Sequence, residues 1–462
     1  GNTNILCNSA ALCASYGAVI AGGVGGNTCG GTFSLASCSF TVAPTCFNAG
    51  IYSFIGGGFQ NRAAGAQSTV SGGYKNIATA SNSAISGGTG NSASATYSFV
   101  GGGLGNSASG TRSGIVSGES NLASANYSFV GAGYDSTASG SYSAVVGGYQ
   151  NSASGYGSFV GSGRGNGAGG TFSTVSGGYV NIASGSRSTI IGGASNVASG
   201  NCSTAGGRTN TASGGFSVVF GVNSTASGYI SAIAGGNSNI TSCCYSFIGG
   251  GINNCATHGY TIVVGGENNR ATDCAAFVGG GQSNTASGFR STISGGSNHV
   301  ASGAYSFIGG GNANSASGAC STIGGGTSNT ASNTNSFVGG GSGNLSASSM
   351  STVGGGQANT ANNTRATVGG GASNTSSGYR ATISGGAANT SSGYASFVGG
   401  GSSNASTGTH STLGGGVANT TSGTYSVLGG GYVNVVSTYS GTISGGYRNC
   451  ICAGSYNTIS GG

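Results

Sequence analysis

The residues best suited to chemistry form a regularly spaced column between residues 243 and 274. Cys243, His258 and Asp273 follow one another at intervals of fifteen residues. A Cys, a His and an Asp brought together could supply an activated thiol nucleophile or the ligands of a metal ion. A surface column without a pocket rarely makes such a site, and the same residues also form an ordinary polar ladder in which His258 pairs with Asp273. We favour the ladder, and predict that the protein is not an enzyme and has no catalytic residue, metal site or cofactor.

Other reactive side chains belong to the same stretch. Arg270 comes one interval after Cys255 and is predicted to stack on it, while Glu267 and Cys274 are predicted to lie close to the column. The chain has only four acidic residues. Outside this stretch they form no pair spaced for glycoside cleavage.

Thirteen cysteines are a second source of chemistry. In stacked turns, two cysteines at the same repeat position would have Cα atoms about 4.8 Å apart, which suits a disulfide. None of those after residue 50 meets this condition, since Cys244 and Cys274 share a position but lie two turns, about 9.6 Å, apart. We therefore expect free thiols or disulfides between chains, with head-to-tail joining of the two cysteine-bearing ends, in an oxidising extracellular setting. The candidates for intermolecular disulfides are Cys7, Cys13, Cys29, Cys38, Cys46, Cys202, Cys243, Cys244, Cys255, Cys274, Cys320, Cys450 and Cys452.

A fifteen-residue repeat must position these side chains. Its clearest copy is residues 98–112, Ser-Phe-Val-Gly-Gly-Gly-Leu-Gly-Asn-Ser-Ala-Ser-Gly-Thr-Arg, whose residues we number as positions one to fifteen. The period begins at Ser53, is one residue short in the turns from Ser203 and Ser217, and ends with a turn at Asn457. Because fifteen residues hold two short strands and two tight corners, the repeat predicts an all-β solenoid, or β-roll, of about 28 regular turns.

The interior of this solenoid follows from strand geometry. Side chains alternate along a strand, so positions one and three face inward with positions nine and eleven, and position two faces outward. The interior is then Ser, Val or Ile, Asn and Ala. Gly at positions five, six and thirteen is predicted to mark the corners, because Gly adopts positive φ at little cost. Stacked Asn at position nine is predicted to form a ladder of amides that donate and accept along the stack. Clear members are Asn61, Asn76, Asn91, Asn106, Asn121, Asn314, Asn329 and Asn344.

The composition is typical of a repeat protein, and the regularity of the repeat divides the chain into three parts. There are 103 Gly, one Pro and no Trp, and only 3% of residues are charged, where a soluble domain has about 25%. We interpret residues 1–52 as an irregular Cys-rich cap or docking segment, 53–447 as the regular solenoid and 448–462 as a terminal turn with a Cys pair. The net charge of +7 comes from scattered Arg and Lys residues, so nucleic acid is not an expected partner. No apolar stretch suits a membrane span or a signal peptide.

Position two carries the largest outward side chains. Phe recurs there every second turn over two long stretches. The favoured interpretation is a contact face in which Phe fits small-residue gaps on a neighbour, and the alternative is a wider core that includes position two. The predicted lateral contacts are Phe99, Phe129, Phe159, Phe247, Phe277, Phe307, Phe337 and Phe397. Position fifteen is often Tyr or Arg; we favour stacked, solvated side chains there over a second contact face.

Asn-X-Ser/Thr triplets are a by-product of the repeat. Many use the Asn of position nine, which is predicted to face inward, so most are not expected to accept glycans. The triplets begin at Asn126, Asn201, Asn223, Asn239, Asn344, Asn362, Asn374, Asn389, Asn404 and Asn419.

The run Ser-X-Ile-Gly-Gly-Gly-X-X-Asn-X-Ala-Ser-Gly resembles the head repeats of YadA-type trimeric adhesins and related bacterial and phage surface fibres. The resemblance covers about residues 53–462 and includes no catalytic residue. It implies β-roll coils that associate as trimers. The repeat here is longer by a corner residue and the chain is richer in Cys, and in this it is similar to insoluble sheath or filament proteins of some prokaryotic envelopes.

Three functions are compatible with these features. The leading expectation is an extracellular structural protein that assembles with itself into a fibre, sheath or shell, on a cell or virion surface, through stacked strands, apolar lateral contacts and intermolecular disulfides. The alternative is a trimeric adhesin or phage or virus fibre head that binds a host or cell surface. The third is an ice-binding solenoid, suggested by a short Thr column, but the Phe residues at the same position argue against it. The column is Thr352, Thr367 and Thr382.

Overall fold

The chain folds as an all-β parallel solenoid of about 27 turns, as predicted, with two short strands per turn and no helix among the described residues. The computed structural model describes residues 19–20, 33–34, 39–40, 47–48 and 50–462. Most of the predicted N-terminal segment lies outside these residues, and so do five of the predicted disulfide candidates. These are Cys7, Cys13, Cys29, Cys38 and Cys46.

The chain divides into two compact units, Gly1–Ile230 and Ser231–Gly462, which are described separately. The division falls inside the region 53–447 that the repeat predicts as continuous, directly after the two short turns. Before residue 50, β2 (Phe33–Ser34) and β3 (Ser39–Phe40) form an antiparallel pair. By contrast, β1 (Val19–Ile20) and β4 (Phe47–Asn48) pair in parallel with the first regular strands, β5 (Phe54–Ile55) and β6 (Arg62–Ala63).

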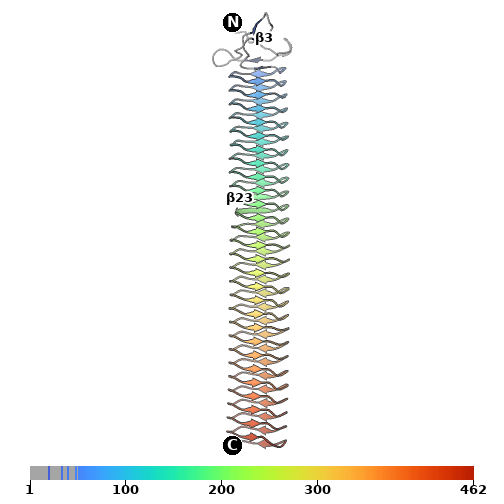
Figure 1. Ribbon diagram of the computed structural model, residues 1–462, viewed down its shortest axis with the longest axis vertical. Coiled ribbons are helices and arrows are strands. Elements are labelled where there is room, and N and C mark those ends of the chain that lie inside the picture. The colour runs from blue at the N-terminus through green and yellow to red at the C-terminus, as the bar shows by residue number, and fades with distance from the viewer. Residues whose placement is uncertain (1–18, 21–32, 35–38, 41–46, 49) are drawn as a thin grey trace. The chain divides into compact units, whose positions relative to one another are not determined.

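Strands occupy the same repeat positions in each regular turn, the first at positions two and three and the second at ten and eleven. Examples are β11 (Phe99–Val100) and β12 (Ser107–Ala108), which pair in parallel with β13 (Gly114–Ile115) and β14 (Leu122–Ala123) of the next turn. Figure 1 shows the strands stacked as successive rungs within each unit. The first-strand column runs from β5 to β27 (Val218–Val219) in the first unit and from β29 (Ala232–Ile233) to β59 (Thr458–Ile459) in the second.

The core of each unit lies between its two strand columns and consists of small side chains. Val100 and Ala108 are fully buried, and so are Ser98 and Asn106. This burial confirms the predicted inward positions one, three, nine and eleven. Full burial of a Val or Ile side chain stabilises by about 1.5–3 kcal/mol, whereas Ala contributes less. Hydrogen bonds between neighbouring turns must therefore carry much of the structure.

The short turn from Ser203 loses its residue at one corner and keeps its strands aligned. Here the strands lengthen to β23 (Thr189–Ala194) and β25 (Thr204–Arg208), whose register shifts between Ile190 and Gly193. The pairs on either side of the shift, such as Thr189 with Thr204, stay in register. The missing residue is therefore absorbed at this corner, and the pairing of the strands on either side is unchanged.

The corners use positive φ in a pattern that differs from the predicted one. Gly at position six has it in the regular turns, as in Gly386 (φ +89°), but Gly385 at position five does not. Gly393, at position thirteen, is needed for close packing, because a Cβ there would lie 2.0 Å from the Gly408 carbonyl oxygen of the next turn. Positions eight and fifteen adopt positive φ without requiring Gly, as at Arg112 (φ 57°). Position five varies, since Gly280 has φ +145° there. The conformational reason predicted for Gly is therefore wrong for position thirteen and for Gly385.

Candidate functional site

Each Asn side chain of the buried ladder binds the backbone of its own turn and of the next turn. The N–H of Asn106 donates to Asn91 Oδ1 at 2.9 Å, and Asn106 Nδ2 donates to the carbonyls of Gly102 and Gly118, both at 2.8 Å. Direct amide-to-amide bonds are less frequent and longer, as between Asn181 Nδ2 and Asn166 Oδ1 at 3.2 Å. The ladder thus links three successive turns through main-chain groups, and its polar atoms are satisfied although they are buried.

His299 takes one place in this ladder and fills it only in part. Its N–H donates to Asn284 Oδ1 at 3.0 Å, and its Nδ1 accepts from the Asn314 N–H at 3.1 Å. The ring is therefore neutral, with its proton on Nε2. Among the described residues Nε2 has no hydrogen-bond partner. Burial lowers the pKa of His299, although nearby backbone groups oppose the shift in part.

The Cys–His–Asp column does not assemble into a joint site. The structure shows no ion pair between His258 and Asp273 among the described residues. Instead, His258 Nδ1 lies 3.4 Å from the Thr257 hydroxyl, and Asp273 Oδ1 accepts from the N–H of Cys274 at 2.6 Å. The predicted pairing is wrong because each side chain finds a closer partner on its own turn.

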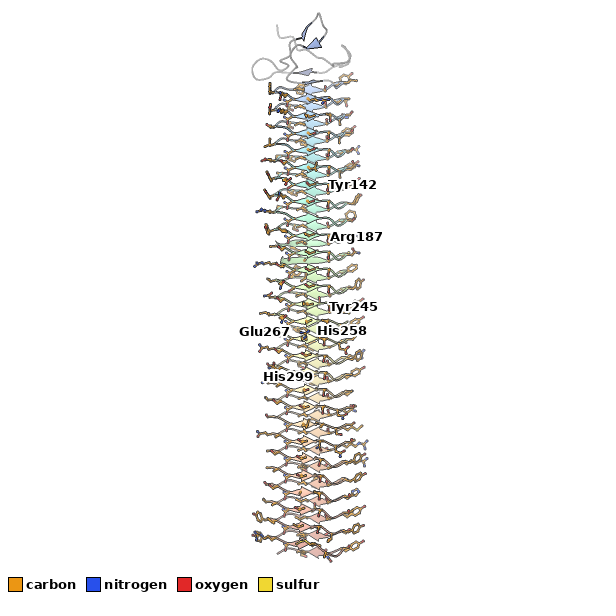
Figure 2. All side chains as sticks on the ribbon, in the orientation of Figure 1. Tyr142, Arg187, Tyr245, His258, Glu267 and His299 are labelled. Carbon is orange, nitrogen blue, oxygen red and sulfur yellow. A yellow bond between two sulfur atoms is a disulfide. The ribbon has the colours of Figure 1, made fainter. Side chains whose placement is uncertain are left out.

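Glu267 lies apart from this column. It occupies position seven, at the other corner of the turn, where its carboxylate accepts from Asn268 and Gln282. Figure 2 shows Glu267 and Tyr245 at opposite edges of the second unit. The expectation that Glu267 lies close to the column is therefore wrong. Within the described part of the chain, no group of three or more His, Cys, Asp or Glu residues is placed to hold a metal ion.

Six cysteines of the described region are free thiols: Cys202, Cys243, Cys244, Cys255, Cys274 and Cys320. Cys255 is paired with Arg270 on the next turn, as predicted. Burial raises the pKa of the Cys255 thiol, and the Arg270 charge offsets this only in part. Because the thiolate is the nucleophile, Cys255 is a poor candidate for chemistry.

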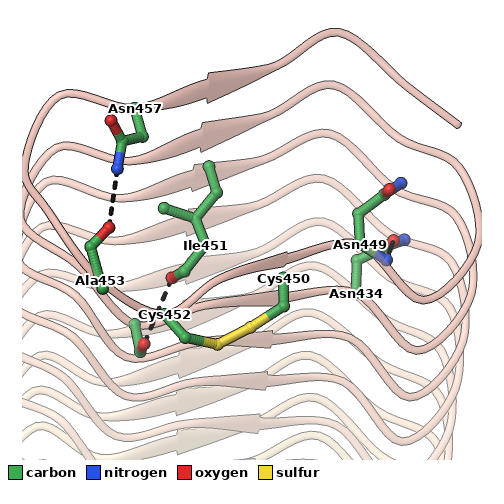
Figure 3. Close-up of a disulfide and its surroundings, with 8 residues drawn as sticks. Asn434, Asn449, Cys450, Ile451, Cys452, Ala453 and Asn457 are labelled. Carbon is green, nitrogen blue, oxygen red and sulfur yellow. Dashed lines mark hydrogen bonds between the residues drawn. A yellow bond between two sulfur atoms is a disulfide. The ribbon is translucent and has the colours of Figure 1, made fainter.

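Cys450 and Cys452 form a disulfide with each other (Figure 3). The prediction that these two cysteines form disulfides between chains is therefore wrong in this structure. The prediction compared only cysteines on different turns. Cys450 lies on β58 (Cys450–Ile451) and Cys452 follows directly after it, with the two Cα atoms 5.7 Å apart, within the range that a disulfide bridges.

The Phe residues of position two point outward, as predicted for a contact face. Phe99, Phe129 and Phe159 in the first unit are each about 40% exposed, and Phe247, Phe307 and Phe337 in the second are similar. Phe277 and Phe397 are half-buried. The alternative of a wider core is wrong for the single chain, because none of these side chains is enclosed by it.

Each of these Phe residues is accompanied by Gly at position four, a coupling that sequence reasoning missed. A Cβ at Gly131 would lie 3.5 Å from Cε1 of Phe129, and a Cβ at Gly114 of the preceding turn 3.7 Å from its Cδ2. The ring therefore lies along the sheet and covers glycine backbone, a role known as aromatic rescue of glycine. The signal was available in the sequence: Gly follows two residues after every position-two Phe.

The turns between the Phe turns complete an apolar strip. Between Phe99 and Phe159, these turns have a small residue at position two and Val at position four: Gly114 with Val116, and Ala144 with Val146. Val116 and Val146 are nearly half exposed. In the first unit, large apolar groups thus alternate between two columns at every turn from Phe99 to Phe159. We call these residues the apolar strip: Phe99, Val116, Phe129, Val146 and Phe159.

Aromatic and Arg side chains stack along the position-fifteen corner. In the first unit the rings of Tyr127 and Tyr142 are 4.7 Å apart, and the guanidinium of Arg112 lies 5.3 Å from the Tyr127 ring. Tyr142 and Arg187 project from this edge in Figure 2. In the second unit the rings of His410 and Tyr425, both at position fifteen, are stacked with centroids 5.3 Å apart. They belong to a longer run of rings from adjacent corner positions, 5.3–5.7 Å apart, in which some neighbours meet edge to face: Tyr379, Tyr394, His410, Tyr425, Tyr439 and Tyr456. The predicted stacking is confirmed for these position-fifteen pairs.

The outer side of the second strand column is more polar. Position ten has Thr360, Thr375 and Thr390 in register on successive turns. On the first column, the predicted column of Thr352, Thr367 and Thr382 is also in register, but Phe337 and Phe397 flank it. On the side that carries Phe, the Thr column is therefore limited to these three turns.

None of the described residues forms a helix long and apolar enough to cross a bilayer. No protein-family model matches the chain, and no curated protein matches it either. The resemblance to adhesin head repeats therefore remains a prediction from the repeat alone.

Proposed function

We propose that the protein is a structural component that assembles with copies of itself into a fibre, sheath or shell outside the cell or on a virion. The observation that carries this proposal is the row of outward Phe residues in each unit, joined in the first unit by the intervening Val116 and Val146. Soluble monomers seldom leave such a regular apolar band in water.

The exposed area supports an interaction surface. A whole aromatic side chain has about 200 Å² of surface, so three Phe residues that are roughly 40% exposed leave on the order of 240 Å². With Val116 and Val146, the apolar strip reaches the roughly 300–600 Å² typical of the largest, often functional, patches on monomers. This is less than the about 800 Å² per partner of a standard interface. Assemblies in which many such strips act together are therefore favoured over an isolated pair.

The scarcity of charge favours assembly as well. With 3% charged residues, the surface offers little electrostatic repulsion between copies. Cys244 and Cys320 are free and exposed, which leaves their thiols available for bonds between chains. Such disulfides form and persist in oxidising compartments.

Electron microscopy of the native protein, with and without strong reduction, tests the proposal. We expect ordered polymers that loosen or shorten in reductant. A protein that is a soluble monomer in both conditions overturns it.

A trimeric adhesin or fibre head is the second candidate, favoured by the resemblance of the repeat to YadA-type heads. Its partner would be a host or cell surface. Analytical ultracentrifugation separates the two candidates, because a discrete trimer gives one sedimenting species and open polymerisation gives a broad, concentration-dependent series.

A further inference from the structure

Six glycan acceptor triplets begin with an Asn of the buried ladder in the second unit. In these turns, position eleven is Ser or Thr where most turns have Ala, and this creates the Asn-X-Ser/Thr triplet. Both the Asn and the hydroxyl residue are buried in every case. The acceptors are Asn239, Asn344, Asn374, Asn389, Asn404 and Asn419, and the partners are Thr241, Ser346, Ser376, Ser391, Ser406 and Thr421.

The atom that would carry the glycan is fully used by the fold. Asn404 Nδ2 donates to the carbonyls of Gly400 at 2.9 Å and Gly416 at 2.8 Å. A glycosylated Nδ2 keeps one N–H and can make only one of these bonds. The carbonyl left without its partner would be buried, which costs about 1–3 kcal/mol.

There is also no room for a sugar. A single carbon atom added at Gly401 would lie 2.6 Å from Asn404 Nδ2, and one added at Gly371 would lie 2.7 Å from Asn374 Nδ2. A hexosamine ring is many times larger. Modification of a ladder Asn therefore forces the two adjacent turns apart.

Burial in the folded protein does not prevent this modification, because oligosaccharyltransferase acts on chains that have not yet folded. In that reaction the Asn Nδ2 forms a bond to C1 of an oligosaccharide carried on a polyprenyl diphosphate. The bond from C1 to the diphosphate oxygen breaks, the lipid diphosphate leaves and Nδ2 gives up one proton. An extended chain presents all six triplets to the enzyme.

We propose that N-glycosylation and folding of the second unit exclude one another, so that the native protein must fold on a route without oligosaccharyltransferase. The cytosol and bacterial export are such routes, and the endoplasmic reticulum is not. The constraint holds whatever the assembled protein does.

Other triplets of the chain are placed differently and serve as an internal comparison. Asn126, Asn201 and Asn362 are exposed at corners or on outward positions. A glycan at these residues would extend into solvent without entering the ladder.

The test compares the full chain with a variant that has Ala at position eleven of these six turns, as most other turns do. Both are produced with a secretion signal in a eukaryotic cell line, and both are also made in the bacterial cytosol. The variant replaces the six position-eleven partners by Ala, as Ser376→Ala and its five equivalents, which removes the buried triplets and keeps the exposed ones. Glycopeptide mass spectrometry, β-sheet circular dichroism and the thermal midpoint are measured.

We expect both proteins from bacteria to be native, with a somewhat lower midpoint for the variant, because it loses buried hydroxyl bonds such as that from Ser376 Oγ to the Ala381 carbonyl oxygen at 2.8 Å. When made by the secretory route, the full chain with its original sequence should carry glycans on ladder residues and lose its native circular dichroism spectrum. The six-Ala variant should be native. An inhibitor of lipid-linked oligosaccharide synthesis should restore native folding to the full chain with its original sequence. Native secreted protein overturns the proposal, whether its ladder residues are modified or not. A failure of both proteins that the inhibitor does not relieve also overturns it, because the cause is then not the glycan.

Discussion

At the scale of the residue, the ladder shows how closely one side chain is matched to its place. Asn fits because one short side chain reaches main-chain groups of its own turn and of the next: Asn91 Nδ2 donates to the Gly87 and Gly103 carbonyls, and Asn91 Oδ1 accepts from the Asn106 N–H. His299 supplies the acceptor through Nδ1 but has no group that replaces the two donations of Nδ2. It is therefore the weak member of the ladder.

Replacement of this His by Asn should stabilise the second unit. The variant His299→Asn restores two hydrogen bonds, each contributing about 0.5–1.5 kcal/mol. The folded-state pKa of His299 is lowered, so the neutral ring contributes stability above the unfolded-state pKa of about 6.5 that is lost as pH falls through the lowered folded-state value. The gain from His299→Asn should thus be larger in acid than at neutral pH, as measured by thermal unfolding.

His410→Asn is the matched control, because His410 is an exposed corner residue. It should change the acid dependence of the midpoint little. Equal acid dependence for the His299→Asn variant and the unmodified protein would contradict the assignment of a neutral, buried ring.

The thiols should differ in reactivity within one molecule. Burial raises the pKa of Cys255, so a smaller fraction is thiolate at neutral pH than for an exposed Cys. Alkylation followed by peptide mass spectrometry should label Cys320, which is exposed, before Cys255. In denaturant the two rates should converge. A faster reaction at Cys255 in the native protein would refute this order.

At the scale of the element, each turn consists of two strands whose side chains alternate and two corners whose backbone is constrained. The strands and the inward positions could be predicted because alternation and a fifteen-residue period leave few choices. The exact corner conformation could not, since Gly is used for positive φ at Gly386 and for close packing at Gly393. Composition alone does not separate these two reasons.

Two adjacent glycines test this distinction. Gly386 has φ +89°, and a Cβ there would lie 2.2 Å from the Gly401 oxygen, whereas a Cβ at Gly385 would meet nothing within 4 Å. We expect Gly386→Ala to destabilise by about 1–3 kcal/mol or more from backbone strain alone. Gly385→Ala should be neutral or stabilise by up to about 1 kcal/mol.

Unfolding in denaturant, followed by circular dichroism, measures both changes. Position five already holds Ala132 in another turn, whereas position six holds Gly in the regular turns. Similar losses for the two variants would show that the corner does not depend on the conformation of Gly386.

Site prediction failed where partners lay within one turn. Comparing equivalent positions of successive turns predicted the Arg270–Cys255 neighbours correctly. It missed the Cys450–Cys452 disulfide and the cover of Gly131 by Phe129, which both join residues two apart in the sequence. The His258–Asp273 pair was predicted for the same reason, although nearer groups satisfy both side chains.

At the scale of the whole molecule, the first strand column has an apolar outer side and the second a more polar one. Self-assembly should therefore depend on the apolar strip and not on apolar residues in general. Position two holds Thr in many turns, among them Thr69 and Thr174, so Thr is compatible with the fold there. This allows the strip to be weakened with residues that the repeat already uses.

The triple variant Phe99→Thr, Phe129→Thr and Phe159→Thr should assemble less than the unmodified protein, because it removes all three aromatic side chains of the apolar strip. Sedimentation velocity over a range of concentrations measures the loss. The control is Ile77→Thr with Ile182→Thr, since these residues are similarly exposed but lie on the second strand column. If the control weakens assembly as much as the Phe variant, the strip is not the contact face.

The bonding pattern has a genetic consequence. Within each unit, the backbone hydrogen bonds join a turn to its immediate neighbours, as Phe99 to Ser113 and Ser107 to Asn121. Removal or duplication of fifteen codons therefore deletes or adds one complete rung and leaves every remaining pairing intact. The length of each unit can thus change by whole turns while the pairing of the remaining turns stays the same.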